Sequence, residues 1–288
     1  MNRKQFVTIG SATHPGMKKK ENQDFHSWRF PGNGNLNKKG ILLVLADGMG
    51  GHSGGSVASR LAVDTAMEEY YKDETETIQE SLKKAFLKAN ESVLEKSRSN
   101  LGLQGMGTTL IAVVLQKDNL YFAHVGDSRG YTIFGNRITQ FTRDHSIVAG
   151  LVKAGLITKE EALNHPDSNI ITKAIGLFQD LSVDISEKHM QLNKGEYVLM
   201  CCDGLYKVVP DEEIVKTIIE YREPDTVCGK LIEKANERGG PDNITVIIAR
   251  IENPGFISGI KIMFQDILRK KIEAPRRRAV GESSPQRI

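Results

Sequence analysis

Three apolar runs of strand length, each with an aspartate at one end, constrain the fold of this chain most strongly. Asp47 follows the run ILLVLA, Asp203 follows VLMCC, and Asp242 stands just before NITVII. Apolar runs of this length predict buried strands, and an Asp-Gly pair after such a run is first of all a turn signal. Because the ends of separate strands can converge on one place, the three aspartates together also predict a carboxylate cluster.

The remaining patterns predict an α+β chain rather than a regular alternation of one strand and one helix. Apolar residues recur at helical spacing from residue 53 onward and over residues 76–98, and residues 107–140 have the alternation and the Gly135-Asn136 turn that are typical of an antiparallel meander. We predict strands over residues 6–9, 41–46, 107–115, 119–125, 129–134, 196–202 and 243–251, and further helices within 146–169 and over 210–221 and 224–237.

Two more aspartates stand in short polar motifs, Asp24 in ENQD and Asp127 in GDSR. A buried group of carboxylates does not stay ionised without cations, because burial penalises each charge and like charges repel. Oxygen ligands with almost no His or Cys nearby favour hard cations such as Mg²⁺ or Mn²⁺ over zinc or copper. The carboxylates therefore indicate metal-assisted hydrolysis or phosphoryl chemistry.

Other phosphatase and nucleotide-binding mechanisms lack their required motifs. No Cys is followed by five residues and an Arg, no D-x-D is present, and no G-x-x-x-x-G-K-[ST] occurs. These absences argue against a cysteine nucleophile, an aspartyl-phosphate enzyme and a P-loop NTPase. Asp24-Phe25-His26 matches D-x-H, but the G-N-H motif of calcineurin-like metallophosphoesterases is missing. Direct attack by a metal-activated water remains.

Composition restricts the compartment and the partners. Three cysteines, two of them adjacent, form a poor disulfide framework and fit a reducing compartment, and no segment reaches the length of a membrane span. We therefore expect a cytoplasmic protein. The formal charge of +3 comes from the segment after Gly255, which holds eight Lys or Arg against three Asp or Glu. Because the rest of the chain has no basic excess, we expect no nucleic-acid partner.

Eight motifs in order resemble the bacterial branch of the PPM family of Mg²⁺- or Mn²⁺-dependent protein phosphatases, often called the PP2C type. The resemblance covers about residues 6–251 and implies a four-layer αββα sandwich, in which helices flank two central, mainly antiparallel sheets. It places the phosphatase domain at residues 1–252. The motifs are ENQD (21–24), ADGMGGHSGG (46–55), GMGTT (105–109), HVGDSRGY (124–131), FTRDHS (141–146), ITKAIG (171–176), LMCCDGLYKVV (199–209) and GGPDNITVII (239–248).

The resemblance implies two or three bound Mn²⁺ or Mg²⁺ ions. Asp47 would bridge two of them, and the backbone carbonyl of Gly48 would help to bind one. Asp203 and Asp242 would complete the binuclear site. A glycine suits this position, because without a side chain its carbonyl can turn toward a cation.

Further site residues follow from the same resemblance. Asp127 would join Asp203 in binding a third, weaker cation, and Asp24 would act through metal-bound water. Lys19 stands where the family usually has an Arg that grips phosphate, and the alternative is that it belongs to a solvated basic loop. A lysine supplies charge without the planar fork, so we expect a different phosphate affinity or substrate preference. His52 is the histidine closest to the first metal motif and is predicted either as the general acid or as a structural residue at a helix N-terminus.

The implied mechanism is one in-line displacement, in which a metal-activated water attacks the phosphorus of phosphoserine or phosphothreonine without a phosphoenzyme. We expect a protein Ser/Thr phosphatase that acts on phosphorylated proteins and opposes a Ser/Thr kinase. One alternative is a phosphatase dedicated to a single phosphoprotein, such as an anti-sigma-factor antagonist. Another is a catalytically silent adaptor that binds phosphoproteins, which the presence of all the metal aspartates disfavours.

Residues 253–288 form a basic, amphipathic tail in this interpretation. Apolar residues recur at helical spacing from Phe256 to Leu268, ahead of the basic runs RKK (269–271) and PRRR (275–278). Such a segment can lie on an anionic membrane surface or dock a partner protein. The alternative is a helix packed on the catalytic domain, followed by a disordered end.

Overall fold

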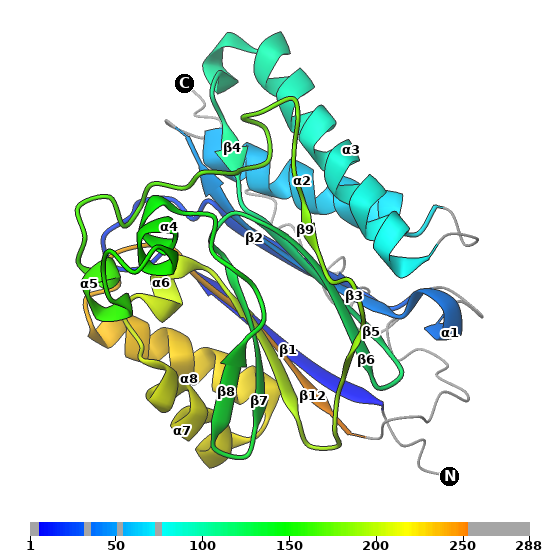
Figure 1. The fold of residues 1–288 in the computed structure, drawn as a ribbon, viewed down its shortest axis with the longest axis vertical. Coiled ribbons are helices and arrows are strands. Elements are labelled where there is room, and N and C mark those ends of the chain that lie inside the picture. The colour runs from blue at the N-terminus through cyan, green and yellow to red at the C-terminus, as the bar shows by residue number, and fades with distance from the viewer. Residues whose placement is uncertain (1–5, 32–35, 51–53, 73–76, 253–288) are drawn as a thin grey trace, which may run out of the picture. The chain divides into compact units, whose positions relative to one another are not determined.

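The computed structural model describes residues 6–31, 36–50, 54–72 and 77–252, and all of them belong to one compact unit. Two sheets stack face to face, and helices cover the outer face of each (Figure 1). Every described strand pairing is antiparallel. The predicted αββα sandwich with mainly antiparallel sheets is therefore confirmed.

The first sheet holds both ends of the described chain side by side, because β1 pairs with β12 along its whole length. The second sheet is centred on β3 and β5, which pair with each other between β2 and β6. In order, the first sheet contains β1 (Val7–His14), β12 (Ile244–Ile251), β11 (Tyr197–Cys201), β7 (Arg129–Phe134) and β8 (Arg137–Gln140). The second contains β10 (Met190–Gln191), β6 (Asn119–Val125), β5 (Leu110–Gln116), β3 (Ile41–Met49) and β2 (Asp24–Arg29), with β4 (Gly107–Thr108) beside β3 and β9 (Asp184–Ile185) beside β6.

Two pairs of long helices form the outer layers (Figure 1). On the second sheet lie α2 (Gly54–Tyr70) and α3 (Ile78–Ser99), and on the first lie α7 (Asp211–Tyr221) and α8 (Pro224–Glu237). Short elements connect the layers: α1 (Leu36–Lys39), η1 (Leu101–Leu103), α4 (Ile147–Lys153), α5 (Lys159–Leu163) and α6 (Asp203–Tyr206).

The continuous apolar character of β3 follows from its place between two apolar layers. Alternate side chains of a strand point to opposite faces of its sheet. Leu42 and Val44 accordingly pack in the layer beneath α2 and α3, whereas Leu43 and Leu45 pack between the two sheets. All four are buried, so the run ILLVLA needs no polar alternation.

One prediction about topology is wrong: residues 107–140 do not form a single meander. β5 pairs with β6 in the second sheet, whereas β7 pairs with β8 in the first. The chain crosses between the sheets at Gly126, whose φ of 108° suits glycine and where a Cβ would lie 2.6 Å from the Cβ of Thr109. Hairpin signals show which neighbouring strands pair, but they do not show which sheet receives each pair.

The two Asp-Gly pairs also differ from the turns that their local signal indicates. β3 continues through Asp47 to Met49 and pairs there with β4, while Asp203 is the first residue of α6. β2 was not predicted, because its sequence DFHSWR has no apolar run. β1 is longer than the predicted strand over residues 6–9 and reaches His14. The two helices predicted over 210–221 and 224–237 are present as α7 and α8.

No helix within the described ranges combines the length and the apolar character that a bilayer span requires. The predicted tail of residues 253–288 lies outside the described residues.

The layer between the sheets is expected to be a large source of stability. Leu45 is fully buried in it, so Leu45→Ala is expected to lower the free energy of unfolding by about 2–5 kcal/mol. Leu101→Ala is the matched control, because Leu101 is exposed and its loss should change stability by no more than about 0.5 kcal/mol. Urea unfolding followed by circular dichroism measures both. Equal stability of the two variants would contradict this account of the core.

Candidate metal centre

Asp24 and Asp47 lie directly opposite each other where β2 and β3 pair. Two threonine hydroxyls fix the backbone at Asp47. Its N–H donates to Thr109 Oγ1 at 2.9 Å, and its carbonyl accepts from Thr108 Oγ1 at 2.8 Å. Burial, together with the nearby charges of Asp24 and Asp203, raises the pKa of the Asp47 carboxyl well above its ordinary value. This carboxylate therefore needs a compensating positive charge to stay ionised.

Asp24 is buried behind Asp47 with one oxygen unsatisfied. Its Oδ2 accepts a hydrogen bond of 2.7 Å from Thr245 Oγ1, whereas its buried Oδ1 has no partner. Burial raises the pKa of this carboxyl to about 7, although the bond from Thr245 acts in the opposite direction. Asp24, Asp47 and Cys202 each offer one ligand atom within 4.8 Å of the others.

Cys202 is part of the support rather than a ligand. Its thiol donates to the Asn243 carbonyl at 3.3 Å, and its Sγ accepts from the Thr245 N–H at 3.1 Å. Burial raises the pKa of the thiol well above its ordinary value, which keeps it protonated. The ligand set of the cluster is thus made of oxygens, which fits Mn²⁺ or Mg²⁺.

Gly48 is required by close backbone packing. A Cβ at this position would lie 2.2 Å from the Gly55 carbonyl oxygen and 2.5 Å from that of Gln23. The Gly48 N–H donates to the same Gln23 carbonyl at 3.2 Å. Any side chain here would push the end of β3 away from the first residues of α2, so the glycine keeps the backbone of the ADGMG motif at the cavity.

Asp203 and Asp242 approach the same cavity from the ends of β11 and β12. Asp203 Oδ2 accepts a bond of 2.7 Å from Lys207, and Asp242 Oδ1 lies 2.7 Å from Lys19 Nζ. Burial opposes the charge of Lys19, but the hydrogen bond and the charge of Asp242 raise its pKa overall. Both carboxylates are therefore paired with ammonium groups, in contrast to Asp47.

Asp127 is held in the crossing between the sheets. Its Oδ2 accepts from the Tyr206 hydroxyl at 3.3 Å, and burial followed by the charge of Asp203 raises its pKa to about 7. Arg129 stacks over the Tyr206 ring at 3.6 Å and pairs with Asp144 through two nitrogens. This arrangement fixes the tyrosine that holds Asp127.

His145 supports the same crossing and is not a metal ligand here. Its backbone N–H donates to the Gly126 carbonyl at 2.8 Å, and its Nδ1 accepts from the Gly126 N–H at 3.1 Å. Its Nε2 lies 3.1 Å from Asp184, and its ring stacks on buried His124 at 4.8 Å. The hydrogen bonds of His145 and the packing of His124 therefore support the crossing between the sheets.

Five of the predicted metal residues line one cavity of about 560 Å³, and Lys19 lines it too. The cavity gathers strand ends that are far apart in the sequence, as the apolar runs indicated. Asp24 lies behind it, and His52 falls outside the described residues. The five are Asp47, Gly48, Asp127, Asp203 and Asp242.

Two cavity residues, Asn243 and Asn169, and the neighbouring Lys207 were missed from the sequence. The Asn243 side chain accepts from the Gln23 N–H at 2.8 Å and donates to the carbonyls of Pro15 and Glu21 at 2.9 Å, which fixes the loop that carries Lys19. Lys207 and Asn169 bond to each other at 2.6 Å. Asn243 directly follows Asp242, so its place beside a predicted ligand could have been inferred from the motif. The Lys207–Asn169 contact joins two segments in which no sequence pattern predicts that they meet.

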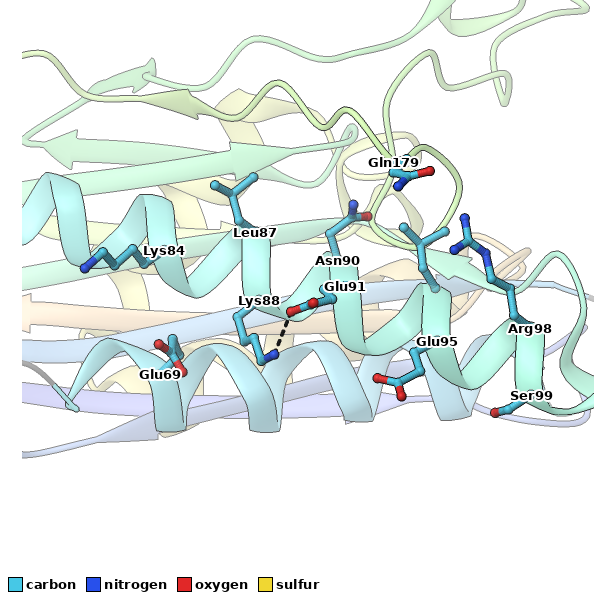
Figure 2. A pocket seen from close by; sticks show the side chains of 11 residues that line it. Glu69, Lys84, Leu87, Lys88, Asn90, Glu91, Glu95, Arg98, Ser99 and Gln179 are labelled. Atoms are coloured by element: carbon cyan, nitrogen blue, oxygen red, sulfur yellow. Dashed lines mark hydrogen bonds and ion pairs between the residues drawn. The ribbon is translucent and has the colours of Figure 1, made fainter.

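A second hollow lies along α3, away from the carboxylates (Figure 2). It has a volume of about 960 Å³, and its lining mixes both signs of charge, including a Lys88–Glu91 pair at 2.6 Å. A surface of alternating charges paired along one helix is typical of a solvated face. The larger hollow therefore lacks the convergent acidic groups that distinguish the smaller one.

Comparison with known proteins assigns the family. The model described as Protein phosphatase 2C matches residues 17–225. The chain belongs to the protein phosphatase 2C family. The "Serine/threonine phosphatase stp" of Listeria welshimeri is 38% identical over 212 residues, which are 72% of this chain and 83% of that relative.

Solved structures agree with this family assignment. The Mycobacterium tuberculosis serine/threonine phosphatase PstP/Ppp has a TM-score of 0.75 and 33% identity, over 86% of this chain and 99% of the other. The catalytic domain of PstP, solved "in complex with 2 Manganese ions", has a TM-score of 0.74 and 32% identity, over 86% and 99%. The oxygen-rich cavity of this family member fits such a pair of ions.

Stability of the metal-free protein is expected to fall as the pH rises from about 4 to about 7. Over this range Asp24 and Asp127 keep protons in the folded state, because their pKa values are about 7, but lose them in the unfolded chain, where the value is near 3.8. The folded state thus binds more protons, and raising the pH favours unfolding. Bound Mn²⁺ neutralises the ionised carboxylates and so removes this loss of stability. The melting temperature in Mn²⁺ should therefore exceed that in EDTA by a margin that grows across the same pH range.

Thermal melts of the wild type and of Asp24→Asn/Asp127→Asn isolate this contribution, since the variant cannot titrate at these positions. In EDTA, the melting temperature of the variant should rise relative to that of the wild type as the pH increases. A difference that does not change with pH would contradict the proposed burial of the two carboxyls.

Proposed function

We propose that this chain removes phosphate from phosphoserine and phosphothreonine in proteins by metal-dependent hydrolysis, with two Mn²⁺ or Mg²⁺ ions held by Asp47, the Gly48 carbonyl, Asp203 and Asp242. The convergence of these groups on one cavity carries the proposal. Membership of the protein phosphatase 2C family and the manganese ions in a relative of the same fold support it. When bound, two such ions lower the pKa of water and neutralise phosphate charge.

The protein's own groups would position the phosphate. Lys19 faces the cavity from a loop fixed by Asn243, and its side chain is 50% exposed. An ion pair as exposed as Lys19–Asp242 is weak, so the ammonium group can move to a phosphate oxygen when a cation neutralises Asp242. The planar, bidentate contact of an arginine is not available, and we expect weaker orientation of the phosphate than in relatives that have one.

Asp24 is assigned to the shell around the cations. Its buried Oδ1 has no partner among the described residues and lies beside Asp47. An unpaired carboxylate oxygen in such a place can accept a hydrogen bond from a water that a cation holds. His52 remains a prediction as general acid, with a structural role at the start of α2 as the alternative.

The expected substrates are phosphorylated proteins, and we assign the chain to a pair with an opposing Ser/Thr kinase in the cytoplasm. A phosphatase dedicated to one phosphoprotein is the alternative that uses the same site. We retain the division into a phosphatase domain of residues 1–252 and a basic tail of residues 253–288. The tail either docks on an anionic membrane surface or a protein partner, or packs as a helix on the catalytic domain ahead of a disordered end. A silent phosphoprotein-binding adaptor is disfavoured by the intact carboxylate cluster.

Asp47→Asn and Asp203→Ala are each expected to lower turnover of p-nitrophenyl phosphate and of a phosphothreonine peptide by about a thousandfold or more, because each removes a ligand of the cation pair. EDTA should abolish wild-type turnover, and added Mn²⁺ should restore it. Asp180→Asn is the control, since Asp180 is an exposed residue outside the cavity and its loss should leave turnover unchanged.

Turnover of the wild type in EDTA, or full activity of Asp47→Asn, would contradict the mechanism. A wild type that binds a phosphothreonine peptide but turns over neither substrate with any divalent cation would favour the adaptor.

A further inference from the structure

We propose that the ammonium group of Lys207 takes the place of the third cation expected between Asp127 and Asp203, so that this chain binds two divalent cations and carries the third positive charge in its own sequence. The inference rests on the proposed function, because it concerns the same cavity. It departs from the resemblance to the family, which implied a third, weaker cation at these two aspartates.

The ammonium group of Lys207 is fixed on two oxygens at the cavity. Its Nζ donates to Asp203 Oδ2 at 2.7 Å and to Asn169 Oδ1 at 2.6 Å. Its side chain is only 20% exposed, and that of Asp203 is 16% exposed. Two short bonds in a mostly buried place leave little freedom for the ammonium group to move away.

The local backbone directs this side chain back over the start of α6. The Lys207 N–H donates to the Asp203 carbonyl at 3.0 Å, which closes one helical turn between the two residues. The N–H groups of Val208 and Val209 both donate to the Leu205 carbonyl, and Val209 is fully buried beneath the turn. Residues four apart on a helix face the same way, so Lys207 and Asp203 meet.

Asp203 binds this ammonium group directly, and Asp127 and Asp47 line the same cavity as Asp203. These aspartates come from α6, from the crossing after β6 and from β3. Asn169 adds a neutral oxygen from the loop after α5. The ammonium group therefore lies in the negative potential of this cluster, which would otherwise attract a third cation.

A comparison with Lys19 shows why Lys207 is the lysine that stays at its aspartate when cations bind. Lys19 also lies 2.7 Å from a metal aspartate, Asp242, but the two side chains are 50% and 40% exposed. Water screens such a pair, and among the described residues no second hydrogen bond holds the Lys19 ammonium group. A cation can displace the Lys19 ammonium group at little cost. Displacing that of Lys207 breaks two hydrogen bonds and requires a mostly buried ammonium group to find new partners.

Equilibrium dialysis of the full-length chain against Mn²⁺, with bound metal measured by atomic emission, tests the inference. The wild type should bind two Mn²⁺ ions per chain and show no third until far higher concentrations. Lys207→Met should expose the two aspartates and bind a third Mn²⁺ with a dissociation constant lower than that of the wild type by at least about tenfold. Lys230→Met is the matched control, because Lys230 pairs with Glu233 on α8, away from the cavity, and its loss should leave the stoichiometry at two.

Asp127→Asn in the Lys207→Met background should remove the third Mn²⁺ again. The proposal is overturned if the wild type binds a third Mn²⁺ as tightly as Lys207→Met, or if Lys207→Met binds only two. Circular dichroism checks that each variant is folded, and Lys207→Gln replaces Lys207→Met in the same experiment if the latter is not. A wild type that binds fewer than two Mn²⁺ ions would instead count against the proposed function, so the two failures are distinguishable.

Discussion

The repulsion among carboxylates brought together at the strand ends is the interaction on which the rest of this structure depends. Burial raises the pKa values of Asp24 and Asp127 to about 7, and burial together with the charges of Asp24 and Asp203 raises the pKa of Asp47 well above its ordinary value. Packing of apolar strands such as β3 and β11 supplies the free energy that holds these groups together. Without cations the cluster opposes folding, and with them it becomes a catalytic centre, so stability and function are linked through the same residues.

Backbone contacts around the cavity make that cluster rigid. Thr108 and Thr109 fix the end of β3, and Asn243 fixes the loop that carries Lys19. Gly48 allows an approach between backbones that no other residue would permit. A metal-dependent hydrolase benefits from such rigidity, because groups that are already placed need no reorganisation during the reaction. Gly48 and Asn243 stand next to ligand aspartates in sequence, whereas Thr108 and Thr109 belong to a separate motif, which explains why several whole motifs rather than single aspartates define the family resemblance.

The sequence was sufficient where apolar patterning and motifs were strong. The strands at Ile41, Tyr197 and Ile244, the helices α7 and α8, and the convergence of Asp47, Asp127, Asp203 and Asp242 on one cavity agree with the structure. The sequence was insufficient where the pairing of distant segments decides which sheet a strand joins. β6 and β7 separate at Gly126 into different sheets, and β2 lacks an apolar run because it is an edge strand with mostly half-buried side chains. Lys207 lies four residues after Asp203, a spacing that could have signalled the pair, but Asn169 gave no comparable signal.

The central claim is that Asp47, the Gly48 carbonyl, Asp203 and Asp242 hold the catalytic cations. Anomalous diffraction at the manganese absorption edge, from crystals grown with Mn²⁺, locates the bound ions directly. The account predicts peaks within coordination distance of these four groups, with Asp47 contacting two ions. Ions located away from Asp47, or an empty cavity under conditions in which the protein is active, would contradict it.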